Sequence, residues 1–160
     1  MYPWLVFLHV TGVFGFLMAH GVSAGVYFAL RRERNPDRIR VLLEMARGTY
    51  GVAMLSLVML FVTGIITGFM GQWWSRGWIW LSLILLIVLS GVMSVLGSRI
   101  LNEARLGLGL RSTWNQSPRP EPMSAEELDA LLSRSRPMLL TVIGFGGLAV
   151  IAWLMMFKPF

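Results

Sequence analysis

Apolar residues run along this chain in four long stretches separated by shorter polar segments. The first stretch, from Pro3 to Leu30, contains no formally charged residue and ends at a pair of arginines. At about 1.5 Å of rise per residue it would form roughly 42 Å of helix, more than the ~30 Å hydrocarbon core of a bilayer requires. The pattern therefore predicts an all-α, integral membrane four-helix bundle, with spans at about 3–30, 48–70, 78–98 and 137–157.

The polar segment between the first two spans carries the start signal of a helix. Asn35 is a favourable N-cap residue, and Pro36 suits the first helical position. Residues 36–48 place Ile39, Leu42, Leu43 and Ala46 at helical spacing. We therefore expect this amphipathic piece to lie at the membrane interface and to run straight on into the second span.

The longer polar segment, 99–136, divides into three parts. Residues 99–106 are predicted to continue the third span out of the membrane and to place in solvent the side chains of Arg99, Glu103 and Arg105. The proline-rich run Ser117–Pro122 reads as a rigid connector. Ser124 with Glu127 is a capping-box pattern, which predicts a short helix that ends near Ser135.

Small and hydroxyl-bearing residues interrupt the spans at regular spacing. Glycines four residues apart, in 21–25 and in 64–68, predict close approach of neighbouring helices. A set of small residues in the third span predicts that its inner end is closely packed: Ser90, Gly91, Ser94 and Gly97. Three hydroxyls share one face of the second span: Ser56, Thr63 and Thr67. They either bond to carbonyls of their own helix or form a polar strip that faces the first span.

Composition and the placement of charged residues indicate where the protein lies and how it is oriented in the membrane. The chain of 160 residues is 56% hydrophobic and 14% charged, whereas soluble domains carry about 25% charged residues. One domain, 1–160, is expected. Every basic residue except Arg76 and Lys158 lies in 31–47 or 99–136, which predicts that these segments are cytoplasmic loops and that both termini lie outside the inner membrane. The expected partner of the basic loops is the lipid bilayer, not nucleic acid.

Two further features of the sequence bear on signal-peptide cleavage and on cysteine chemistry. Positive charge follows the first apolar stretch instead of preceding it, so the first span is expected to be retained and not cleaved as a signal peptide. The absence of cysteine excludes disulfides and thiolate sites. The tryptophan-rich turn 71–78 predicts an interfacial aromatic belt, with stacking of a quinol or tetrapyrrole as the alternative.

The only histidines, His9 and His20, both lie in the first predicted span. Eleven residues at about 100° each come to roughly 20° past three turns, so both rings are expected on nearly the same side of the helix, about 16 Å apart. Phe16 and Tyr27 fall on the same line. A polar stripe in a membrane helix needs a partner that lipid does not supply. Either a prosthetic group binds there, or His9 is merely interfacial and His20 bonds to a hydroxyl across a helix contact.

The residue types allow few chemistries. Hydrolysis lacks a Ser-His-Asp set, and ion-driven transport lacks an intramembrane carboxylate. Histidine as a haem ligand remains, so we expect a haem b bound through His9 and His20, with Phe16 and Tyr27 beside it, and a role in electron transfer. The second axial ligand is left open, including one from a homo-oligomer or from another subunit of a membrane complex. The alternative is a cofactor-free structural or assembly subunit; copper handling through thioethers and tetrapyrrole processing are lesser alternatives.

Short motifs also give the chain a resemblance to known proteins. The sequence Leu8-His-Val-Thr-Gly12, the arginine-rich loop, Met45-Ala-Arg47 and the tryptophans that flank the third span resemble a bacterial group of small four-span proteins. That group includes copper-resistance D-type domains, an uncharacterised family of predicted integral membrane proteins, and HemJ-type protoporphyrinogen oxidases. The last resemblance implies a haem b at His9. HemJ-type proteins also carry a lysine in the third helix, and 78–84 has none, which argues against the oxidase activity and leaves haem binding open.

Overall fold

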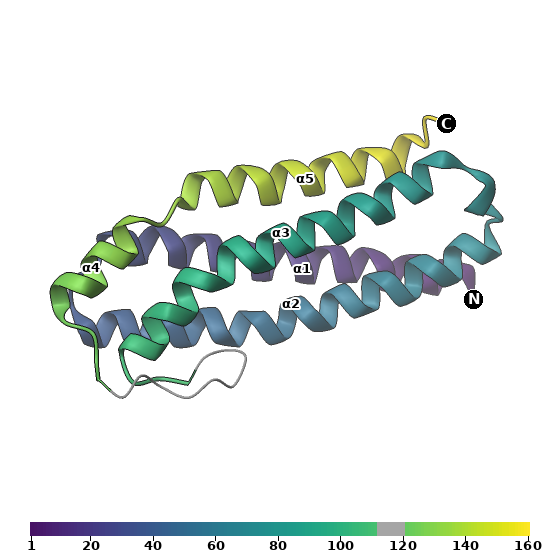
Figure 1. Ribbon diagram of the computed structural model, residues 1–160. Helices are drawn as coiled ribbons and strands as arrows, with labels where there is room; N and C mark the ends of the chain where they lie inside the picture. The colour runs from purple at the N-terminus through teal and green to yellow at the C-terminus, as the bar shows by residue number, and fades with distance from the viewer. Residues whose placement is uncertain (112–120) are drawn as a thin grey trace.

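The computed structural model describes residues 1–111 and 121–160, and within them the regular structure is entirely helical, with no strand (Figure 1). The elements are α1 (Tyr2–Arg32), α2 (Pro36–Met70), the short 3-10 helix η1 (Trp73–Ser75), α3 (Gly77–Gly107), α4 (Ala125–Ser133) and α5 (Pro137–Phe157). Four of them, α1, α2, α3 and α5, are long and apolar enough to cross a membrane. The prediction of an all-α chain is confirmed, as is the prediction of four helices long and apolar enough to span a membrane.

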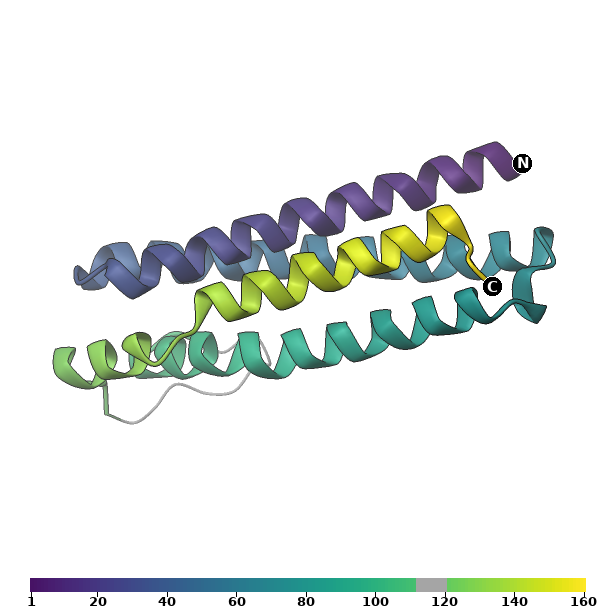
Figure 2. The same ribbon diagram turned by 90° about the horizontal axis from the view of Figure 1, so that it is seen from above.

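The four long helices lie side by side as two antiparallel pairs. The most extensive contact joins α1 to α2, the next joins α3 to α5, and contacts between the pairs are sparse. Figure 2 shows α1 and α3 separated, with α5 between them in that view, and both termini at the same end of the molecule. We call the boundary between the α1–α2 pair and the α3–α5 pair the seam, and the end that carries N and C the termini end.

Close approach within the pairs depends on glycine. Gly12 lies against Leu60 of α2, and a Cβ added at Gly147 of α5 would lie 2.8 Å from Leu89 of α3. Such contacts suit a membrane protein, because helices in lipid associate by close packing and not by hydrophobic burial. Of the two predicted glycine motifs, the one at 64–68 meets neighbouring side chains, whereas Gly25 has open space beside it.

The turn between α1 and α2 is fixed by side-chain caps. Asn35 accepts hydrogen bonds from the backbone N–H groups of Asp37 (2.9 Å) and Arg38 (3.2 Å), and Pro36 is the first residue of α2, so both predictions are confirmed. Glu33 accepts from the N–H groups of Asn35 and Arg34, each at 3.0 Å. These two bonds, led by the one from Asn35, hold the pKa of the Glu33 carboxyl below its usual range.

Opposite the termini end, the helices extend into a compact headpiece. Its core joins the ends of α1, α2 and α3 to the amphipathic α4 through Val26, Leu30, Ile39, Leu43, Ala46, Ala104, Leu128, Leu131 and Leu132. Residues 36–48 do run straight into the second span, as predicted. Their apolar face packs against α4 and the neighbouring helices in this core.

The short helix α4 begins with the capping box that the sequence predicts. The Ser124 hydroxyl accepts from the N–H of Glu127 at 3.2 Å, and the Glu127 carboxylate accepts from the N–H of Ser124 at 2.9 Å. The helix ends at Ser133, two residues before the predicted end. Most of the proline-rich run Ser117–Pro122 lies outside the described residues.

Arg105 corrects the prediction that the end of α3 projects only solvent-exposed charges. Arg99 and Glu103 are exposed, but Arg105 is 2% exposed. Its guanidinium donates to the Glu44 carboxylate at 2.8 Å, to the Leu43 carbonyl at 3.0 Å and to the Arg111 carbonyl at 2.7 Å. The cause is the length of α3, which continues alongside α2 into the headpiece, so that one of its faces turns inward there.

Candidate functional site

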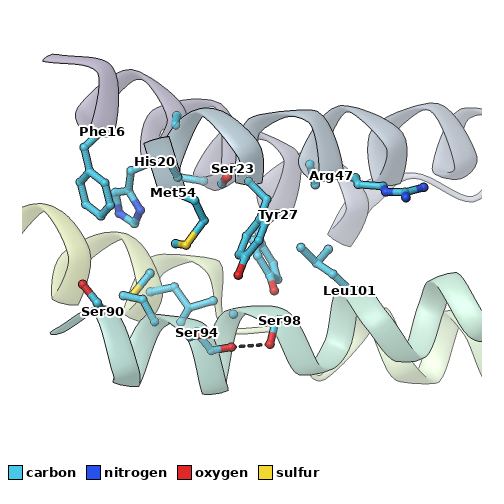
Figure 3. A pocket seen from close by; sticks show the side chains of 18 of the residues that line it. Phe16, His20, Ser23, Tyr27, Arg47, Met54, Ser90, Ser94, Ser98 and Leu101 are labelled. Atoms are coloured by element: carbon cyan, nitrogen blue, oxygen red, sulfur yellow. Dashed lines mark hydrogen bonds between the residues drawn. The ribbon is translucent and has the colours of Figure 1, made fainter. Parts of the chain in front are cut away.

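A cavity of about 180 Å³ lies in the seam between the middle of the membrane-spanning helices and the headpiece. Its wall includes Phe16, His20 and Tyr27 from α1, Met54 from α2, and Ser90 and Ser94 from α3 (Figure 3). We call it the seam cavity. The small residues of α3 were expected to pack closely here. Instead Ser90, Ser94 and Gly97 line the cavity, and Gly91 has open space beside it.

Three polar atoms at this cavity have no hydrogen-bond partner among the described residues. They are Nε2 of His20, the hydroxyl of Tyr27 and the hydroxyl of Ser90, and each is buried. Tyr27 as a residue is only 5% exposed. An unsatisfied buried polar group costs about 1–3 kcal/mol, so three that line one cavity indicate that something else satisfies them.

Helical spacing brings these groups together. His20 and Tyr27 are seven residues apart on α1, so both point across the seam from the same side of that helix (Figure 3). On α3, serines at every fourth position form a hydroxyl row: Ser90, Ser94 and Ser98. The Ser98 hydroxyl donates to the Ser94 carbonyl of its own helix. The Ser90 hydroxyl has no such bond, which leaves it free for a molecule in the cavity.

His20 is held against α5. Its ring meets Phe145 edge to face, with the ring centroids 4.8 Å apart. A Cβ atom added at Gly144 would collide with the His20 ring, so only glycine lets α5 approach this closely. The alternative that His20 bonds to a serine or threonine hydroxyl is not what the structure shows, since Nε2 has no partner.

His9 makes the hydroxyl contact instead, and it does so with α2. Its Nδ1 lies 3.0 Å from the hydroxyl of Thr63, which itself donates to the Met59 carbonyl at 2.6 Å. That hydroxyl has one proton, so when it donates to the Met59 carbonyl it accepts from Nδ1–H of His9. The Thr67 hydroxyl donates to the Thr63 carbonyl of its own helix. On this face of α2, therefore, one hydroxyl faces a histidine of α1, and another only bonds to its own helix.

A second cavity, of about 330 Å³, lies in the seam near the termini end. Aromatic side chains dominate its wall, which includes Tyr2, His9, Trp73, Trp74 and Trp78. We call it the aromatic cavity. The tryptophan-rich turn was predicted to form an interfacial belt; Trp80 is exposed in that way, whereas Trp78 is 2% exposed and packs inside the protein.

The predicted cofactor-binding residues therefore separate. Phe16, His20 and Tyr27 share the seam cavity, whereas His9 lines the aromatic cavity. Helix α1 borders two neighbours, and its two histidines meet different ones: His9 contacts α2, and His20 contacts α5. Sequence reasoning missed Ser90 as a member of the site; its spacing from Ser94 and Ser98 was the available signal.

The seam cavity does not fit a haem b. Haem iron needs a ligand nitrogen that faces a slot wide enough for the porphyrin plane, and Nε2 of His20 lies against the α5 backbone at Gly144. A cavity of about 180 Å³ is little larger than the ~150 Å³ that holds one benzene ring. A porphyrin has four pyrrole rings.

The resemblance to small four-span bacterial proteins rests on short motifs in the first half of the chain, and it stays a resemblance. Function is therefore best argued from the cavities and their unpaired groups. No protein-family model, no curated protein sequence and no solved structure matches this chain.

Proposed function

We propose that the chain is a four-helix bundle of the inner membrane, with both termini outside and the headpiece in the cytoplasm. The four apolar helices support the membrane location. Orientation is supported by charge, since the basic residues other than Arg76 and Lys158 lie in or beside the headpiece or in the segment that leads to it.

Within that setting, we propose that the protein binds the head group of a membrane-soluble quinone in the seam cavity and takes part in electron transfer. The observation that carries the proposal is the pair of unpaired hydroxyls, of Tyr27 and Ser90, at one small and mostly apolar cavity that His20 also lines. Apolar walls with a few converging polar groups are the usual character of small-molecule sites.

The size and chemistry of the cavity suit a single substituted ring. Quinone carbonyls accept hydrogen bonds, which the hydroxyls of Tyr27 and Ser90 can donate. The hydroxyls of the reduced quinol can donate to the hydroxyl oxygens of Tyr27 and Ser90, which accept as well as donate. The oxidised and the reduced form of one ring can thus both form hydrogen bonds in the cavity. In this proposal the quinone takes the electron-transfer role that the sequence had suggested for a haem b.

Access from the bilayer is available between α2 and α3. These helices make few contacts with each other, although seam-cavity residues come from both of them. Among the described residues, Arg105 of α3 is hydrogen-bonded to Glu44 and to the Leu43 carbonyl of α2 at the headpiece. A chain attached to the ring would leave through this gap into lipid, as a membrane-soluble molecule requires.

The test is binding of a benzoquinone that carries a decyl chain to the purified protein in lipid nanodiscs. Ser90→Ala removes an unpaired hydroxyl from the cavity. Ser98→Ala is the matched control, because it removes a hydroxyl from the same helix and the same cavity that already bonds to a carbonyl. Loss of one hydrogen bond of about 1 kcal/mol weakens binding roughly fivefold in Ser90→Ala only.

Equal effects of the two serine variants, or no saturable binding by the unaltered protein, would overturn the proposal. Failure to bind together with stoichiometric co-purification of other membrane subunits would instead favour the structural-subunit alternative.

A further inference from the structure

The aromatic cavity has features of a second binding site, independent of the seam cavity. Its volume of about 330 Å³ falls at the lower end of the range of ligand pockets, about 300–1,000 Å³. All four membrane-spanning helices contribute to the wall, and the indoles of Trp73, Trp74 and Trp78 cover the end nearest the chain termini. Such a wall suits an apolar chain.

The unpaired polar groups at this end are hydrogen-bond donors. Nε1–H of Trp74 is buried and has no partner among the described residues. The Lys158 ammonium lies 4.2 Å from the ring centroid of Trp73 and 5.7 Å from that of Trp78, and it forms no ion pair in the part of the chain that the structure describes. Because an indole and an ammonium donate and do not accept, their ligand must present acceptor oxygens.

Charge placement favours a negative oxygen. Every acidic residue of the chain lies between Glu33 and Asp129, and none lies in η1, in the first turns of α1 and α3 or in the last turns of α2 and α5. The charged side chains near the termini end are Arg76 and Lys158. An anion in the cavity is attracted by Lys158, which lines it, and no side-chain carboxylate lies at this end to repel that anion.

The chain holds Lys158 in place over the cavity. Lys158 ends α5 in the left-handed conformation, with φ of 46°. The residues after it fold back onto α3: the Phe160 carbonyl accepts from the N–H of Trp78 at 3.4 Å, and the Phe160 ring lies against Gly77. The ammonium is therefore positioned at the mouth of the aromatic cavity by contacts with Trp73 and Trp78.

From these observations we infer that the aromatic cavity binds an anionic single-chain amphiphile of the fatty-acid type. The carboxylate meets the Lys158 ammonium and the Trp74 indole N–H, and the apolar chain lies among the aromatic side chains of the cavity.

The experiment measures motional restriction of spin-labelled lipids by the protein in nanodiscs, at a pH where the carboxylate is ionised. The probes are spin-labelled stearate, its neutral methyl ester, and a spin-labelled phosphatidylglycerol. We expect a saturable restricted fraction for stearate alone. Lys158→Gln and Trp74→Phe should each reduce it, the first by roughly tenfold in affinity because a charge-assisted bond is lost. Arg76→Gln, an exposed cation outside the cavity, is the control and should change little.

Several results would refute the inference. Equal restriction of stearate and its methyl ester would mean simple partitioning into the lipid around the protein. Equal restriction of phosphatidylglycerol would assign the site to lipid phosphate. Equal effects of Lys158→Gln and Arg76→Gln would mean that non-specific surface charge, and not the cavity, attracts the stearate. The quinone site is tested with a different probe and different variants, so either proposal can fail while the other stands.

Discussion

Replacing Tyr27 by phenylalanine removes one hydroxyl and leaves the aromatic ring, which lines the seam cavity. In most proteins a buried tyrosine hydroxyl has a protein partner, and its loss is destabilising. Here the hydroxyl has none among the described residues, although the residue is 5% exposed. The change is therefore expected to affect stability and binding in opposite directions.

The magnitudes follow from the cost of an unpaired hydroxyl. Its burial costs about 1–3 kcal/mol, so Tyr27→Phe should make the ligand-free protein more stable by up to about that amount. A ligand that accepts a hydrogen bond from Tyr27 gains about 1 kcal/mol from it, so the variant should bind the decyl benzoquinone roughly fivefold more weakly.

The assay is thermal unfolding in nanodiscs, with and without the quinone, together with a direct binding titration. Tyr2→Phe is the control, because Tyr2 is a partly exposed tyrosine at the other end of the same helix. Reduced stability of the ligand-free Tyr27→Phe protein, together with unchanged quinone affinity, would refute the reasoning, because the hydroxyl would then have a permanent partner such as a bound water.

Three further predictions concern packing and charge. Gly144→Ala should destabilise the protein by about 1–3 kcal/mol in thermal unfolding and weaken quinone binding, because the added methyl group displaces the imidazole beside it, whereas Gly146→Ala, which has open space, should do neither. Glu44→Gln should destabilise by roughly 1–3 kcal/mol, because the guanidinium it pairs with is 2% exposed and keeps its charge, whereas Glu103→Gln on the exposed face should have little effect. Because the pKa of Glu33 is lowered in the folded protein, its stabilising effect is present above the unfolded pKa of about 4 and is lost as pH falls through the folded pKa; unfolding scans from neutral to acidic pH should show that loss, and Glu33→Gln should remove it.

The helices could be predicted from the sequence because their signals are local. Apolar run length located the four long helices, and Asn35 and Ser124 located two helix starts to the residue. These features depend on neighbours within a few positions of the chain. The burial of Arg105 could not be predicted in this way, since its partner Glu44 is brought to it by the packing of α3 against α2.

The candidate site was predicted only in part, and for a related reason. Helical geometry correctly placed Phe16, His20 and Tyr27 on one face of α1. Which neighbour each side chain meets depends on how the two pairs are set against each other, and periodicity carries no such information. His9 therefore meets Thr63 of α2, and His20 meets Gly144 of α5. For the same reason the serines of α3 were expected at a tight contact and instead line the cavity.

The sparse contact between α2 and α3 has a kinetic consequence. The two pairs are tied together at one end by the headpiece core and at the other by Trp73 of η1, whose ring meets Tyr2 of α1 and Trp78 of α3. A structure fastened at both ends bends most easily midway, and regions with few buried contacts open at the lowest free energy. We therefore expect the middle of the molecule to fluctuate most. The residence time of a ligand in the seam cavity would then depend on the stability of the contacts at the two ends of the molecule as well as on the contacts inside the cavity.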